Sequence, residues 1–157
     1  MSYTIVLLSS QGEKNVGTNT TDLDFFVNWA CLPNDHDYKL TFRFTSRLAG
    51  ALTANSQFLV KLVQLGTERN AYFGSDPTKT GHFASSEVIG IINSQTIDTS
   101  HYLNANWSDN PSVYVKGRPN NNQLRVQITD FDGTTLYANT TMVWSLILHF
   151  EECPKKY

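Results

Sequence analysis

The sequence predicts an all-β fold: eight antiparallel strands in one β-sandwich domain. Apolar and polar residues alternate along several segments, which is typical of strands with one buried face. Turn-forming residues separate these segments, and no stretch longer than two turns repeats apolar residues at helical spacing. The chain has 157 residues, enough for one domain with its own core. The predicted strands are residues 3–9, 23–30, 38–46, 57–65, 86–93, 112–117, 123–130 and 141–150.

Three of these segments alternate most clearly: 38–45, 123–129 and 142–150. In the last one, Trp144 and Leu146 fall on the face that we expect to be buried, and His149 falls on the opposite face. The other strands are rich in Val, Ile, Phe, Tyr or Thr, as pleated surfaces prefer. Gly90 interrupts an apolar run, which predicts a β-bulge or a close backbone contact.

The connections predict how the strands are arranged. Turns are expected at Leu32–Asp35, Gly117–Asn121 and Asp132–Gly133, one short helix at 46–55, and two long loops at 66–85 and 94–111. Eight antiparallel strands can protect their edges as a closed barrel or as a two-sheet jelly roll. Unequal loop lengths favour the jelly-roll topology. Its first and last strands are neighbours, so we expect 3–9 to pair with 141–150.

The composition excludes several classes of protein. Charged residues make up 17% of the chain and the net charge is −2, so no basic surface for nucleic acid or for an anionic membrane is expected. Aromatic residues make up 12%, which argues against a disordered chain. Asn, Ser and Thr together supply 44 residues. The longest apolar runs are far shorter than a bilayer-spanning helix requires.

No secretory signal pattern opens the sequence, so an intracellular compartment is expected. Cys31 and Cys153 are the only cysteines. We expect two buried thiols in a reducing environment, with one long-range disulfide as the alternative. Glycosylation sequons begin at Asn19, Asn106 and Asn139, and they are expected to stay unmodified.

The sequence shows no constellation of catalytic, cofactor-binding or metal-binding residues. The histidines lack metal-ligand spacing, and GxSxG, Walker A and GxGxxG motifs are missing. Turn formation and solubility explain the neighbouring carboxylates, so we expect a protein that is not an enzyme and has no cofactor. The histidines are His36, His82, His101 and His149, and the carboxylate pairs are Asp22 with Asp24, Asp130 with Asp132, and Glu151 with Glu152.

Aromatic and Arg side chains on the two long loops are the candidates for partner contact, because such residues commonly anchor protein interfaces. The alternatives are packing within the loops and a sugar-stacking platform, as in a carbohydrate-binding module. The candidates are Arg69, Tyr72, Phe73, Tyr102 and Trp107.

The second half of the chain resembles a known family. Arg118-Pro119 precedes the strand 124–129, an Asp-Phe-Asp-Gly turn follows at 130–133, and a closing strand runs from Trp144 to Glu151. This order is similar to the C-terminal part of single jelly-roll capsid proteins of large icosahedral double-stranded DNA viruses. About 35 residues carry the resemblance, and its motifs are structural rather than catalytic.

The resemblance implies a minor capsid protein or a vertex (penton) protein. Its partners would be the major capsid protein and copies of itself, as a pentamer at the vertex, with assembly in the host cytoplasm. No nucleic acid or membrane partner is expected. A carbohydrate-binding β-sandwich module is the main alternative, and a small trimeric jelly-roll receptor ligand is a weaker one because the signal pattern is lacking.

Overall fold

The structure is a computed structural model that describes residues 1–47, 57–63, 65, 70–72, 83–85, 87–97, 100–107, 110–130, 136–137 and 142–153. These residues form an all-β fold with two short 3₁₀ helices. The strands are β1 (Ser2–Leu8), β2 (Glu13–Lys14), β3 (Asp22–Phe26), β4 (Asp37–Arg47), β5 (Gln57–Val63), β6 (Asn70–Tyr72), β7 (Phe83–Ser85), β8 (Val88–Ile97), β9 (Ser100–Ala105), β10 (Val113–Val115), β11 (Gln123–Thr129) and β12 (Val143–Cys153), and the helices are η1 (Ser9–Gln11) and η2 (Trp29–Cys31).

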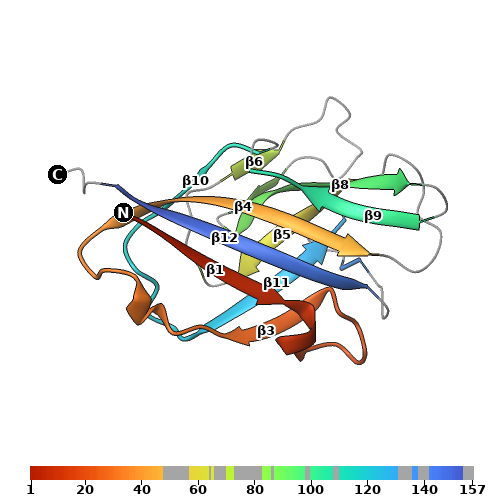
Figure 1. Ribbon diagram of the computed structural model, residues 1–157, viewed down its shortest axis with the longest axis horizontal. Helices are drawn as coiled ribbons and strands as arrows, with labels where there is room; N and C mark the ends of the chain where they lie inside the picture. Colours follow the sequence, from red (N-terminus) through yellow and green to blue (C-terminus); the bar gives the residue numbers. More distant parts are fainter. Residues whose placement is uncertain are drawn as a thin grey trace.

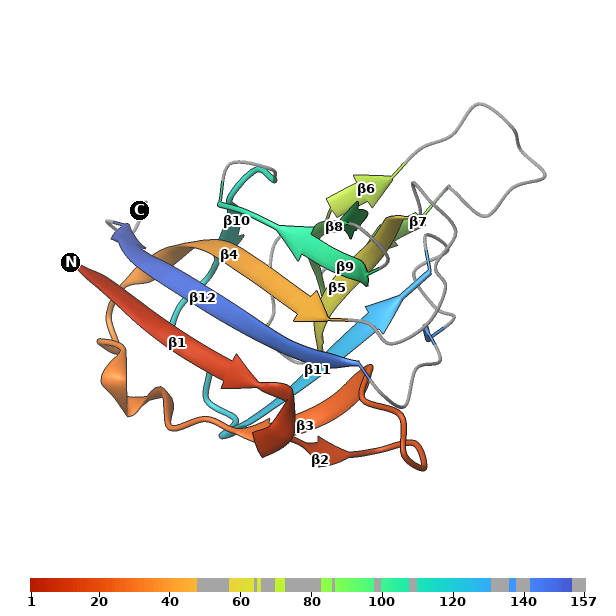
Figure 2. The same cartoon turned by 45° about the vertical axis from the view of Figure 1, so that its right-hand side comes forward.

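Ten of these strands form one antiparallel sheet. Its order is β1-β12-β4-β9-β8-β5-β11-β3-β2, and β10 also pairs with β4, while β6 and β7 form a separate hairpin. The sheet curls, so that β1, β12 and β4 lie across β3, β11 and β5 in both views (Figures 1 and 2). This arrangement is compatible with the predicted β-sandwich, because apolar faces meet between the two halves.

The predicted pairing of the chain ends is confirmed. β1 runs antiparallel to β12, from Ser2 opposite Glu151 to Leu8 opposite Ser145. The predicted parity is also correct, since Trp144 and Leu146 are buried while His149 lies on the opposite face. All eight predicted segments overlap a strand.

Two expected long loops contain strands instead. β8 continues to Ile97, and β9 pairs with it from residue 100 to residue 105, so most of 94–111 is a β-hairpin. Within 66–85, β6 pairs with β7. The count of eight was therefore too low for the described residues. Propensity missed β9 because its Ser and Asn favour turns, whereas the ladder of β8 provides the bonds that make it a strand.

The predicted strand 23–30 ends early, at Phe26. The side chain of Asn28 accepts a hydrogen bond from the Ala30 backbone N–H at 3.1 Å and caps helix η2. Trp29 is still a core residue, and its indole N–H donates to the Asn121 carbonyl at 2.7 Å. The expected helix at 46–55 begins inside β4, and its residues beyond 47 lie outside the described part of the chain. The expected turn at Asp132–Gly133 also lies outside it.

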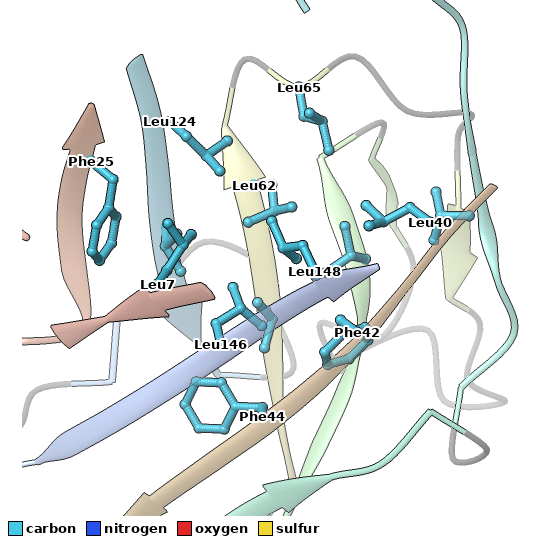
Figure 3. Packing of buried hydrophobic residues seen from close by; sticks show 14 of the residues in the cluster. Leu7, Phe25, Leu40, Phe42, Phe44, Leu62, Leu65, Leu124, Leu146 and Leu148 are labelled. Atoms are coloured by element: carbon cyan, nitrogen blue, oxygen red, sulfur yellow. The ribbon is translucent and has the colours of Figure 1, made fainter. Parts of the chain in front are cut away.

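The core lies between the two halves of the curled sheet (Figure 3). On one side, inward side chains align in rows across three strands, such as Leu7, Leu146 and Phe44. Phe25 and Leu124 project from the opposite half. Such rows arise because side chains alternate with period two along every strand.

Gly90 satisfies both expectations made for it. Val60 pairs with Gly90 and Lys61 with Val88, so Ile89 is the extra residue of a β-bulge. A β-carbon at Gly90 would lie 2.6 Å from the Phe42 ring and 2.7 Å from the Asn110 side chain. Next to Gly90, the Asn110 side chain replaces a neighbouring strand as the hydrogen-bond partner of Ile91. The Asn110 Oδ1 accepts from the Ile91 N–H, and the Asn110 Nδ2 donates to the Ile91 carbonyl, both at 2.8 Å.

The cysteines differ from the prediction. Cys31 is exposed, Cys153 is half-buried, and both are free thiols. Each lies where its element ends, at the last residue of η2 and of β12, so neither is placed in the core.

Candidate interaction surface

The outward side chains of β1, β12 and β4 form a continuous surface, which we call the outer face. Its registers align Leu8 with Ser145 and Thr45, and Val6 with Ile147 and Arg43. The outer face comprises Thr4, Val6, Leu8, Thr41, Arg43, Thr45, Arg47, Val143, Ser145, Ile147 and His149.

Large apolar side chains on this face are exposed to solvent. Val6 is 55% exposed, Leu8 45% and Val143 64%. A single exposed apolar residue is ordinary, but several on neighbouring strands are typical of surfaces that bind another molecule.

A shallow hollow of about 390 Å³ lies at one end of the outer face. Leu8 and Val143 line it together with Arg47. The hydroxyls of Thr45 and Ser145, which also line it, hydrogen-bond each other at 2.7 Å. The hollow thus combines apolar walls with hydroxyl groups and one guanidinium group, a surface suited to binding rather than to acid–base chemistry.

Trp107 lies beside the same face, two residues after β9. Its ring meets the His149 ring edge-on, with centroids 5.9 Å apart, and 40% of the residue is exposed. The His149 Nδ1 lies 3.4 Å from the Thr4 hydroxyl. Of the five predicted contact residues, Trp107 is the one whose side chain the structure places.

The structure describes no side chain of the other four predicted contact residues. Arg69 and Phe73 lie outside the described part of the chain. Tyr72 is the last residue of β6, and Tyr102 pairs with Gln95 inside β9 rather than lying on a loop. The outer face was not predicted from the sequence, because its exposed apolar residues lie on strands and not on the long loops.

A buried ion pair was also missed. Asp22 is fully buried, and its carboxylate accepts bonds from the Arg125 guanidinium at 2.7 and 2.6 Å. Gln127 and Asn15 donate to the same carboxylate at 3.3 and 3.2 Å. The prediction that Asp22 serves turn formation and solubility is therefore wrong.

Burial of Asp22 alone would raise its pKa, because it disfavours the charged carboxylate. The hydrogen bonds from Arg125, Gln127 and Asn15 and the positive charge of Arg125 outweigh burial, so the pKa is lowered. All four side chains belong to the β2–β3–β11 region. In the sequence, Arg125 and Gln127 alternate with apolar residues. This pattern indicates an ion pair only when β3, which carries Asp22, is known to lie beside β11.

The described residues hold no group of three or more His, Cys, Asp or Glu side chains arranged to bind a metal. In the same part of the chain, no helix has the length and apolar character needed to cross a membrane. Neither the models of known protein families nor the curated proteins match this chain.

Proposed function

We propose that this chain is a structural subunit of the capsid of a large icosahedral double-stranded DNA virus, a minor capsid or vertex component with jelly-roll topology. It acts through protein–protein contacts. The observation that carries the proposal is the order in which the chain visits the two halves of the curled sheet. The motifs that resemble the capsid family and the exposed outer face support it.

The strand order favours a jelly roll over a simple meander. One half is ordered β1-β12-β4-β9, with β10 also paired to β4, and the other half is ordered β8-β5-β11-β3-β2. Along the chain, β1 lies in the first half, β3 in the second, β4 in the first and β5 in the second. The same crossing recurs from β10 to β11 and from β11 to β12. A jelly roll requires such repeated crossing between two layers, so this order supports the proposed topology.

The residues behind the family resemblance have structural roles. In the closing strand, Trp144, Leu148 and Phe150 are buried in the core. The Arg118 guanidinium donates to the Leu32 carbonyl at 3.1 Å and so ties the turn before β11 to the end of η2. A rigid sandwich of this kind presents surfaces to neighbouring subunits, and many weak contacts sum to a stable shell.

The test is the protein content of purified virus particles from infected cells that produce this chain. We expect mass spectrometry to find the chain in the particle fraction at a fixed ratio to the major capsid protein. Electron cryomicroscopy of those particles should show density that fits this fold. A chain found only in the soluble fraction would overturn the proposal.

A carbohydrate-binding module is the second candidate, because the half-exposed Trp107 ring could stack on a sugar. A glycan array distinguishes the two candidates. Binding that disappears in Trp107→Ala would favour the module, and an array with no binding would remove it.

A further inference from the structure

The two edge strands of the sheet, β2 and β1, differ in how well they resist pairing with another strand. β2 ends the strand order on one side with two residues, Glu13 and Lys14, and both are charged and exposed. β1 ends it on the other side with seven residues and no charge. Short charged edges prevent the addition of a strand, whereas long uncharged edges allow it.

The hydrogen-bond pattern tells which β1 backbone groups face the open edge. The Glu152 N–H donates to the Met1 carbonyl at 3.0 Å. In an antiparallel pair, bonded and non-bonded residues alternate. The backbone groups of Tyr3, Ile5 and Leu7 therefore form the hydrogen bonds to β12. The N–H and C=O groups of the residues between them point away from β12, toward the open edge; these residues are Ser2, Thr4, Val6 and Leu8. No other described strand pairs with this edge.

The β1 side chains are incompletely covered on both faces. Tyr3 and Ile5 point inward but lie half-buried at the margin of the core. Val6 and Leu8 point outward and are exposed. A strand added beside β1 would cover Tyr3 and Ile5 on the inner side. On the outer side, it would extend the outer face next to Val6 and Leu8.

We propose that a second copy of this chain occupies that edge, with the two β1 strands antiparallel about a two-fold axis. Full overlap of Ser2–Leu8 with its copy places Ile5 on the axis and Thr4 opposite Val6. Inward residues then meet inward residues, so the cores of the two copies become continuous. The inference does not depend on the proposed function.

The charges around the edge allow two copies of the chain to meet without repulsion. No residue within β1 is charged, so the two strands meet without repulsion. At one end of β1, the carboxylates of Glu151 and Glu152 are balanced by Lys39, opposite Glu151, and by the Met1 ammonium, 3.6 Å from Glu152. At the other end, Arg47 lines the hollow with Leu8. Antiparallel pairing places the balanced end of one copy toward the Arg47 end of the other, so no like charges are brought together.

Val6→Pro is the discriminating variant. It removes an N–H that faces the open edge and keeps the hydrogen bonds between β1 and β12, and proline is tolerated on edge strands in this orientation. Val6→Thr is the matched control, because it keeps the N–H and the β-branched shape. Sedimentation equilibrium measures the dissociation constant of the dimer, and urea unfolding verifies that each variant is folded.

We expect the unmodified chain and Val6→Thr to form dimers. The dissociation constant of Val6→Pro should rise by about 30-fold or more, because the dimer loses two hydrogen bonds. A chain that stays monomeric at millimolar concentration would overturn the proposal. So would an oligomer, a pentamer included, whose mass Val6→Pro leaves unchanged, and that second result would leave the proposed capsid function standing.

Cross-linking keeps the proposal testable if Val6→Pro does not fold. On the axis, the two Ile5 residues form a non-bonded pair with Cα atoms about 4.5 Å apart, a separation that a disulfide spans. In a background of Cys31→Ser and Cys153→Ser, Ile5→Cys should give a covalent dimer under mild oxidation. Lys14→Cys, on the opposite edge, is the control. Equal cross-linking of the two variants, or none with Ile5→Cys, would overturn the proposal.

Discussion

The two edges of the curled sheet differ in length, charge and anchoring. The β2 edge is short and charged, and the buried Asp22–Arg125 pair lies on the two strands next to it. The β1 edge is long and uncharged, and apolar residues such as Leu7 anchor it to the core. Among the described strands, one edge of the sheet therefore carries charges that hinder pairing with another chain, and the other edge does not.

Trp144 connects the two edges. Its backbone N–H donates to the Ser9 hydroxyl, just after β1, at 3.0 Å. Its indole N–H donates to the Thr20 carbonyl, between β2 and β3, at 2.8 Å. The ring stacks on Phe44 and meets Phe25 edge-on, at centroid distances of 5.6 and 5.8 Å.

The largest predicted effect is therefore on Trp144→Ala. The residue is 2% exposed, and removal of a buried Trp side chain typically costs about 3–5 kcal/mol of unfolding free energy. Urea denaturation followed by circular dichroism measures that loss. A loss below about 1 kcal/mol would contradict the packing described for both edges.

The next largest effect on the unfolding free energy is expected at the Asp22–Arg125 ion pair, which lies next to the β2 edge. Arg125→Met leaves the Asp22 carboxylate buried without its cation, and breaking such a pair costs about 3 kcal/mol at neutral pH. Asp22→Asn should cost less, because the half-exposed Arg125 side chain can then be solvated. Urea denaturation of both variants at pH 7 gives the comparison, and equal losses would contradict it.

The same pair predicts a dependence on pH. The pKa of Asp22 is lower in the folded protein than in the unfolded chain. Its contribution to stability is thus complete above the ordinary Asp pKa of about 4 and is lost as the pH falls through the lowered value. Unfolding free energies from pH 7 down to pH 2 should fall less steeply in Asp22→Asn than in the unmodified chain. Parallel curves would contradict the assignment.

The smallest expected effect concerns the charges of β2. Glu13→Val with Lys14→Val changes two exposed side chains, so the unfolding free energy should change by no more than about 0.5 kcal/mol. Light scattering at rising protein concentration should, however, reveal new self-association, because the edge has lost its protecting charges. Unchanged scattering would show that the length of β2, not its charge, protects this edge.

Much of the fold could be predicted from the sequence because alternation reports burial directly. The segment 38–45 alternates strictly, and its even-numbered residues Tyr38, Leu40, Phe42 and Phe44 are core residues of β4. β9 could not be predicted in this way, because its residues are mostly polar and its strand conformation depends on pairing with β8.

The candidate surface could be predicted only in part. Trp107 was found because it is an aromatic residue among polar neighbours. The outer face and the open edge depend on which strand ends the sheet, and that is a property of the topology. The Asp22–Arg125 pair joins residues 103 positions apart, and only the register between β3 and β11 brings them together.

Hydrogen exchange at the β1 amides tests most directly whether β1 is the edge through which the chain assembles. At low protein concentration, the amides of Ile5 and Leu7 should be protected, and those of Thr4, Val6 and Leu8 should exchange rapidly. At high concentration, Thr4, Val6 and Leu8 should gain protection while the amides of β2 do not. Exchange at Thr4, Val6 and Leu8 that is independent of concentration would contradict assembly through β1.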